Sequence, residues 1–190
     1  MKYKKIAQKP YCCVGACLEM VLNRRGIKNE GQEDIAYQLG LVVPEEARHQ
    51  FKKARVEDKP LAGYGTQIQK EEYSMNNFFQ KNNIVLHQDY HFIIDIDEAR
   101  KFLKENNEND IVICCYGKTL YNDPHDDWGH MVLFDHIEDD DTVVIVDPSP
   151  KRNYEYIKLN TIVQAIKDHG EANFGGFITI KDNVYQKVKK

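Results

Sequence analysis

The stretch that decides the fold is Gln8–Met20, "QKPYCCVGACLEM", which holds three of the five cysteines of the 190-residue chain. Two of these cysteines, Cys12 and Cys13, are adjacent. From Val14 onward, apolar residues recur three, four and seven positions apart, which is the spacing of one face of an α-helix. Gly26, which follows two arginines, is typical of the position just past a helix C-terminus. We therefore predict a helix that begins at the cysteines and ends near residue 25.

A cysteine at the start of a helix is a candidate nucleophile. The helix dipole and the unpaired N–H groups of the first turn favour the thiolate, which is the reactive form of cysteine. By position, Cys13 is the best placed, Cys12 is a contender, and Cys17 belongs to the apolar stripe. A cysteine on a helix is more often a small core residue. A nucleophile therefore needs support from elsewhere in the chain.

That support comes from a predicted β-hairpin in the second half of the chain. Residues 130–138 and 142–147 are rich in apolar and β-branched side chains, and a short run of aspartates separates them. His130 begins the first run and Asp147 ends the second, so a hairpin would make them near neighbours. Alone, each has an ordinary explanation as a loop or turn residue. Together with Cys13 they predict a Cys-His-Asp site, in which a base activates the thiol and a carboxylate orients the base.

The order of the remaining elements predicts an α+β fold. We expect one domain over residues 1–190, with an N-terminal helical part and a C-terminal antiparallel sheet. Further helices are predicted at 31–40, 44–54, 70–83, 97–106 with Asp97 as its cap, and 161–170 with Asn160 as its cap. Further strands are predicted at 111–117, 153–159 and 175–181, and a loop at 118–129.

Charge and composition exclude several classes of partner. The 26 basic and 30 acidic residues give a net charge of −4, which argues against nucleic acid or an anionic membrane as a partner. The sequence contains no run of 18 apolar residues, so no membrane-spanning helix is predicted. The basic N-terminus lacks the apolar segment of a secretory signal. We expect a cytoplasmic protein with reduced cysteines, while secretion by a signal-independent route stays open.

No cofactor is expected. The cysteine spacing lacks the paired C-x2-C motifs of a structural zinc site. The segment "HDDWGH", with His125, Asp126, Asp127 and His130, offers metal ligands, but its composition favours a polar turn. Glycine-rich nucleotide-binding motifs are also missing from the sequence.

Three motifs, taken together, resemble the papain-like C39 peptidases and the broader C39-like family. These motifs are "Q-x4-C-V-G-A-C-L-E-M-V-L" from Gln8, "G-H-M-V-L-F" around His130, and "V-V-I-V-D-P" ending in Asp147 and Pro148. The resemblance implies a papain-like fold with Cys13 as nucleophile, His130 as base and Asp147 as its orienting carboxylate. It also implies that the side chain of Gln8 helps to bind the oxyanion.

When "A-C-L-E-M" is aligned with the corresponding family motif, Cys13 and not Cys12 takes the position of the nucleophile. Two departures accompany it: Val14 and Gly15 stand where the family usually has glycine and proline, and Gln8 precedes the cysteine by five residues instead of six. The implied function is that of a cysteine peptidase that cleaves a peptide or isopeptide bond in a peptide or protein substrate. An acyltransferase or transpeptidase on the same scaffold, or a catalytically silent peptide-binding module, remains an alternative. The oligomeric state is unknown from sequence.

Overall fold

The computed structural model describes residues 1–60 and 63–183, which form two compact units. The sheet unit comprises residues 1–5, 88–147 and 151–181, and the helical unit comprises residues 6–87, 148–150 and 182–183. The chain enters each unit more than once. The expectation of one domain over residues 1–190 stays a prediction.

The helical unit is built on the predicted N-terminal helix. This helix, α1 (Cys13–Arg24), buries eight of its twelve residues, and Gly26 follows it with a φ of 66°. The other elements are α2 (Gln32–Gln38), β1 (Val42–Val43), η1 (Glu45–Gln50), β2 (Arg55–Val56), η2 (Glu71–Tyr73) and α3 (Met75–Lys81). Strands β1 and β2 pair in parallel.

The prediction of an α-helix at 44–54 is wrong. The segment forms the 3₁₀-helix η1, which ends at Gln50. Within η1 only Ala47 is buried. The segment therefore has no apolar stripe that could hold a longer α-helix in place by packing.

Helices α1 and α2 approach each other closely at Gly15. A Cβ atom at this position would lie only 2.3 Å from the backbone oxygen of Gln32. Only glycine, which has no side chain, allows this contact without a shift of the backbone. The contact places the start of α2 against the first turn of α1.

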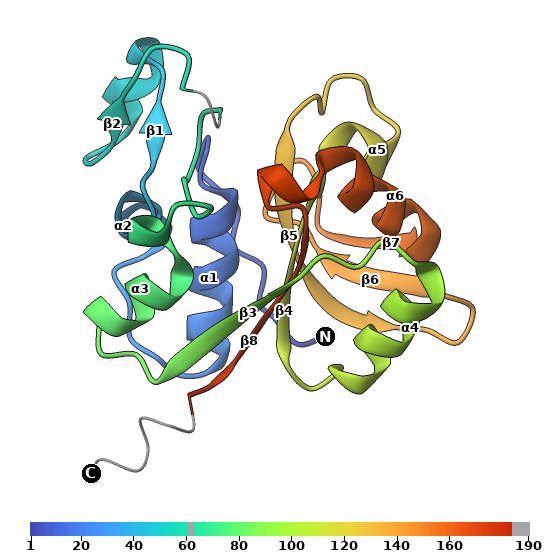
Figure 1. Cartoon of the computed structure of the whole chain (residues 1–190). Coiled ribbons are helices and arrows are strands. Elements are labelled where there is room, and N and C mark those ends of the chain that lie inside the picture. The colour runs from blue at the N-terminus through green and yellow to red at the C-terminus, as the bar shows by residue number, and fades with distance from the viewer. Residues whose placement is uncertain (61–62, 184–190) are drawn as a thin grey trace. The chain divides into compact units, whose positions relative to one another are not determined.

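The predicted antiparallel sheet is confirmed. Its six strands lie in the order β3-β8-β4-β5-β6-β7 (Figure 1). They are β3 (Leu86–His91), β4 (Asp110–Tyr116), β5 (Gly129–Ile137), β6 (Thr142–Val146), β7 (Tyr154–Lys158) and β8 (Gly176–Asp182). Strand β4 pairs antiparallel with β8 and β5, and β5 and β6 form the predicted hairpin.

Three helices share a hydrophobic core with the sheet. They are α4 (Ile96–Glu105), α5 (Gly117–Tyr121) and α6 (Leu159–His169), and the 3₁₀-helix η3 (Glu171–Asn173) follows the last of them. Alternate residues of β4, β5 and β6 point into this core, among them Ile113, Val132 and Ile145. The helices therefore cover one face of the sheet (Figure 1).

Three boundary predictions in the sheet unit are wrong. Helix α4 is capped by Asp95, whose side chain accepts a 2.9 Å hydrogen bond from the Glu98 N–H, and Asp97 is already helical. Helix α6 begins one residue before Asn160, which therefore is not its cap. The predicted loop 118–129 contains most of α5, because Leu120 is buried in the core and holds this short helix in place.

Candidate active site

His130 and Asp147 form a buried hydrogen bond in the sheet unit. Nε2 of His130 lies 3.0 Å from Oδ1 of Asp147, and the two residues are 6% and 0% exposed. Strands β5 and β6 pair Leu133 with Val146, and one further step of this register sets Asp147 opposite Val132. His130 is then the diagonal neighbour of Asp147 on the same face of the sheet. The hairpin thus brings the two predicted residues together.

The carboxylate of Asp147 accepts a second hydrogen bond from Tyr121, the last residue of α5. The Tyr121 hydroxyl donates to Oδ2, whereas His130 faces Oδ1. Burial first, and then the negative charge of Asp147, raises the pKa of Tyr121, so its hydroxyl stays protonated. Tyr121 was not predicted as a site residue, because its segment was predicted to be a loop. The only signal was the adjacent pair of apolar residues, Leu120 and Tyr121.

Cys13 and Cys12 differ sharply in their surroundings, although they are neighbours in the helical unit. Cys12 is the N-cap of α1 and is completely buried, whereas Cys13 is the first helical residue and is partly exposed. Burial first, and then the nearby Cys13 and Glu33, raises the pKa of the Cys12 thiol to about 12. Cys12 therefore stays a protonated, buried thiol at neutral pH, whereas Cys13 is partly exposed.

Gln8 also lies in the helical unit, on a segment of backbone that is held on both sides. Its own N–H donates to the Pro148 carbonyl at 2.7 Å. The Gln32 side chain donates to the Ala7 carbonyl at 2.9 Å and accepts from the Lys9 N–H at 2.6 Å. Among the described residues, the buried Oε1 of Gln8 has no hydrogen-bond partner. The backbone of Gln8 is thus anchored, while its carboxamide has capacity for a further partner.

The loop segment "HDDWGH" is engaged in contacts other than metal binding. Asp126 accepts a 2.6 Å hydrogen bond from Arg152, and Asp127 accepts one from the Tyr116 hydroxyl. In the described part of the chain, no three histidine, cysteine, aspartate or glutamate side chains gather in a way that could hold a metal ion.

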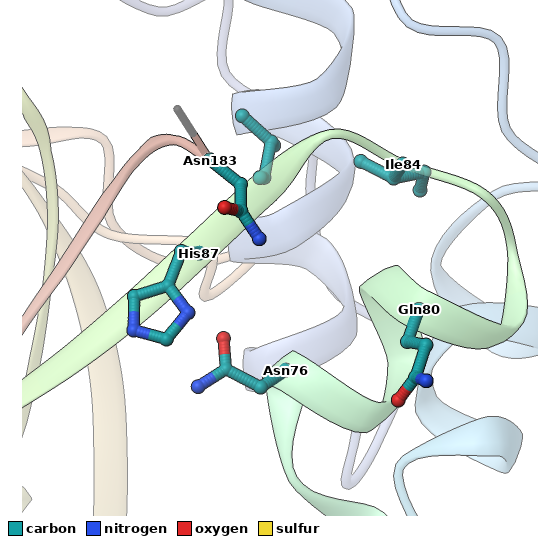
Figure 2. A pocket seen from close by; sticks show the side chains of 6 residues that line it. Asn76, Gln80, Ile84, His87 and Asn183 are labelled. Atoms are coloured by element: carbon teal, nitrogen blue, oxygen red, sulfur yellow. The ribbon is translucent and has the colours of Figure 1, made fainter. Parts of the chain in front are cut away.

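A separate hollow of about 280 Å³ lies in the helical unit (Figure 2). It is lined by Asn76, Gln80, Ile84, Leu86, His87 and Asn183. Figure 2 shows the Asn76 and Gln80 amides on one helix and the His87 ring on the neighbouring strand. None of the four predicted site residues lines this hollow.

No family model and no curated protein matches the sequence. Twelve solved chains do match by structure. Among them is a double glycine motif protease from an AMS/PCAT transporter, solved in complex with the leader peptide. The alignment covers 95% of this chain and 92% of that one, with a TM-score of 0.52 and 17% identity.

At that identity the likeness shows the fold, and it confirms the expected α+β, papain-like architecture of the C39 peptidases. The chain shares its fold with that protease. Across residues 1–60 and 63–183, no helix is long and apolar enough to cross a membrane.

Proposed function

We propose that this chain is a cysteine peptidase that cleaves a peptide or isopeptide bond, with Cys13 as nucleophile, His130 as base and Asp147 as its orienting carboxylate. The observation that carries the proposal is the buried hydrogen bond of 3.0 Å between His130 and Asp147. A carboxylate in this position selects one tautomer of the imidazole and stabilises the imidazolium that forms during acyl transfer.

The proposed reaction assigns a role to each nitrogen of His130. Because Nε2 faces Asp147, Nδ1 takes the proton from the Cys13 thiol. The Cys13 sulfur then attacks the carbonyl carbon, and the imidazolium donates its proton to the leaving amine as the C–N bond breaks. A thioester remains on Cys13. His130 next deprotonates a water molecule, whose attack releases the acid and restores the thiol.

Two donors are proposed for the oxyanion of this reaction. The first is the side-chain amide of Gln8, and the second is the backbone N–H of Cys13, which has no intrahelical partner because it belongs to the first turn of α1. One such donor contributes about 3 kcal/mol to the stabilisation of the transition state. The anchored backbone on both sides of Gln8 is consistent with a group that must stay in place.

The fold also supports the choice of substrate. The double glycine motif protease of the same fold was solved with a leader peptide. We accordingly propose a peptide or protein substrate for this chain. The net charge of −4 argues against nucleic acid or an anionic membrane as a partner. The proposed chemistry needs no cofactor. The cytoplasm is the proposed compartment.

Alkylation of the thiols tests the proposal without a known substrate. Because the other four cysteines are buried, the comparison is made at Cys13 itself. At pH 7, iodoacetamide should modify Cys13 faster in the wild-type protein than in His130→Ala, which lacks the proposed base. Peptide mapping by mass spectrometry gives the rates. Equal rates of Cys13 modification in the two proteins would indicate a catalytically silent binding module.

Cleavage itself is tested by incubating a cell extract with the wild-type protein and with Cys13→Ala. New peptide termini that appear only with the wild-type protein identify the substrate. Cys12→Ala is the matched control and should keep the activity. If added amines are incorporated at the new termini in preference to water, the protein is a transferase on the same scaffold.

A further inference from the structure

The two oxygens of the Asp147 carboxylate contact different groups, the Tyr121 hydroxyl and the His130 ring. Tyr121 donates to Oδ2 and His130 faces Oδ1. The backbone of Asp147 is also held, because its N–H donates to the Asn153 carbonyl at 2.8 Å. A carboxylate with a donor on each oxygen cannot rotate about its Cβ–Cγ bond without breaking a hydrogen bond in a buried site. Such a break is costly.

Arg152 in turn holds the ring of Tyr121. The central carbon of its guanidinium lies 3.4 Å from the centre of the Tyr121 ring, which is the geometry of a cation–π contact. Its Nη2 donates to Oδ2 of Asp126 at 2.6 Å, so the guanidinium is fixed as well. A cation over the ring withdraws electron density from the phenol and makes its hydroxyl a stronger donor. Successive contacts thus connect Asp126 to His130 through Arg152, Tyr121 and Asp147.

We propose that Tyr121 is a positioning residue for the reaction: it donates to Oδ2 of Asp147 and so draws part of the carboxylate's negative charge away from His130, and Arg152 fixes the tyrosine ring in this contact. The inference rests on the proposed function, because it concerns His130 as the base. Tyr121 need not touch substrate in this role.

Charged and titratable groups from several elements lie around His130. They are Asp147 at the end of β6, Tyr121 on α5, Arg152 over Tyr121, Cys115 opposite His130 on β4, and His169 on α6, whose ring lies against Gly129. Replacement of Tyr121 by phenylalanine removes one oxygen and leaves the other groups in place. The change therefore isolates the hydrogen bond to Asp147.

The test uses the Cys13→Ala protein, labelled with ¹⁵N at histidine, and measures the pKa of His130 by NMR titration. In Tyr121→Phe, Asp147 loses a donor that shares its negative charge, so the carboxylate acts more strongly on the imidazolium. The pKa of His130 should rise by about 0.5 to 1 unit. The matched control is Tyr116→Phe, which removes a tyrosine–aspartate hydrogen bond to Asp127 outside the His130–Asp147 pair. The control should leave the pKa of His130 unchanged.

A pKa of His130 in Tyr121→Phe that equals the control value or lies below it would overturn the proposal. If Tyr121→Phe does not fold, 3-fluorotyrosine at position 121 keeps the ring and provides a stronger donor. The pKa of His130 should then fall, and a value at or above that of the parent protein would overturn the proposal.

Kinetics on the active protein provide a second readout. In Tyr121→Phe, kcat should decrease several-fold and KM should stay unchanged. The acidic limb of the kcat/KM profile, which reports protonation of the base His130, should move upward by the same shift that NMR measures. An unmoved limb would contradict the positioning role. The NMR experiment needs no catalytic activity. An inactive wild-type protein would therefore overturn the proposed function and leave the relationship between Tyr121 and His130 measurable.

Discussion

His130 at the start of β5 and Asp147 just beyond the end of β6 are joined by a buried hydrogen bond of 3.0 Å. Antiparallel pairing places the first residues of one strand beside the last residues of the next. The bond therefore follows from the hairpin register and from the inward direction of both side chains. The proposed base and the carboxylate proposed to orient it are thus held by regular structure, which is more rigid than a loop.

Replacing Asp147 by asparagine should lower kcat/KM by about 10²- to 10⁴-fold, because an amide of the same shape no longer stabilises the imidazolium. Steady-state kinetics on the cleaved substrate would measure the loss. The matched control is Asp135→Asn. Asp135 is also buried and also accepts from a histidine, with His136 Nδ1 at 2.8 Å, but it takes no part in the proposed site. An equal loss in both variants would argue for a general effect on folding.

Replacing Gln8 by alanine should lower kcat by about 10²-fold and leave KM nearly unchanged, because the lost donor acts on the oxyanion of the transition state. Gln69→Ala, at an exposed glutamine of the same unit, is the control and should behave like the wild-type protein. Gln32→Ala should show a smaller loss, because it releases the backbone on both sides of Gln8. A change confined to KM in Gln8→Ala would assign the residue to substrate binding instead.

Cys12 should make the stability of the protein depend on alkaline pH. Its pKa is about 12 in the folded state and 9.0 in the reference state, so the folded protein retains a proton that the unfolded chain releases. The contribution to stability is fully present below pH 9 and is lost as the pH rises from 9 toward 12. Between pH 8 and pH 10 the wild-type protein should lose about 1.4 kcal/mol more than Cys12→Ala.

Urea unfolding at the two pH values measures this difference in the free energy of unfolding. Cys17→Ala provides a comparison with a second buried cysteine of the same helix. If the wild-type protein and Cys12→Ala lose stability in parallel, the thiol of Cys12 ionises in the folded state as readily as in the unfolded chain.

Gly15→Ala should reduce the free energy of unfolding by about 1 to 3 kcal/mol, because the new methyl group meets the Gln32 carbonyl oxygen and forces α1 and α2 apart. Urea denaturation would measure the effect. Gly26→Ala is a useful comparison, because no atom lies within 4 Å of the added Cβ and only the positive φ opposes the change. Its cost should be about 1 kcal/mol. A Gly15→Ala protein as stable as the wild type would show that the helices can separate without cost.

Local sequence patterns predicted the elements with strong periodicity. The 3.6-residue stripe from Val14 defines α1, and the two β-branched runs that start at His130 and Thr142 define the hairpin. These patterns succeed because burial on one face imposes a fixed period on each kind of element. The same reasoning failed at α5 and at the cap of α4. There, a single packed side chain or a side-chain hydrogen bond sets the structure, and neither has a period.

By itself, the sequence determined the α+β order of the elements, the position of Cys13 at a helix start, and the proximity of His130 to Asp147. Each depends on residues that are close in the chain or joined by one tight turn. Only the tertiary structure decided that Cys12 is buried and Cys13 partly exposed, and that Tyr121 completes the hydrogen bonding of Asp147. Burial and side-chain partners depend on segments distant in the sequence, and no local pattern encodes which of them will meet.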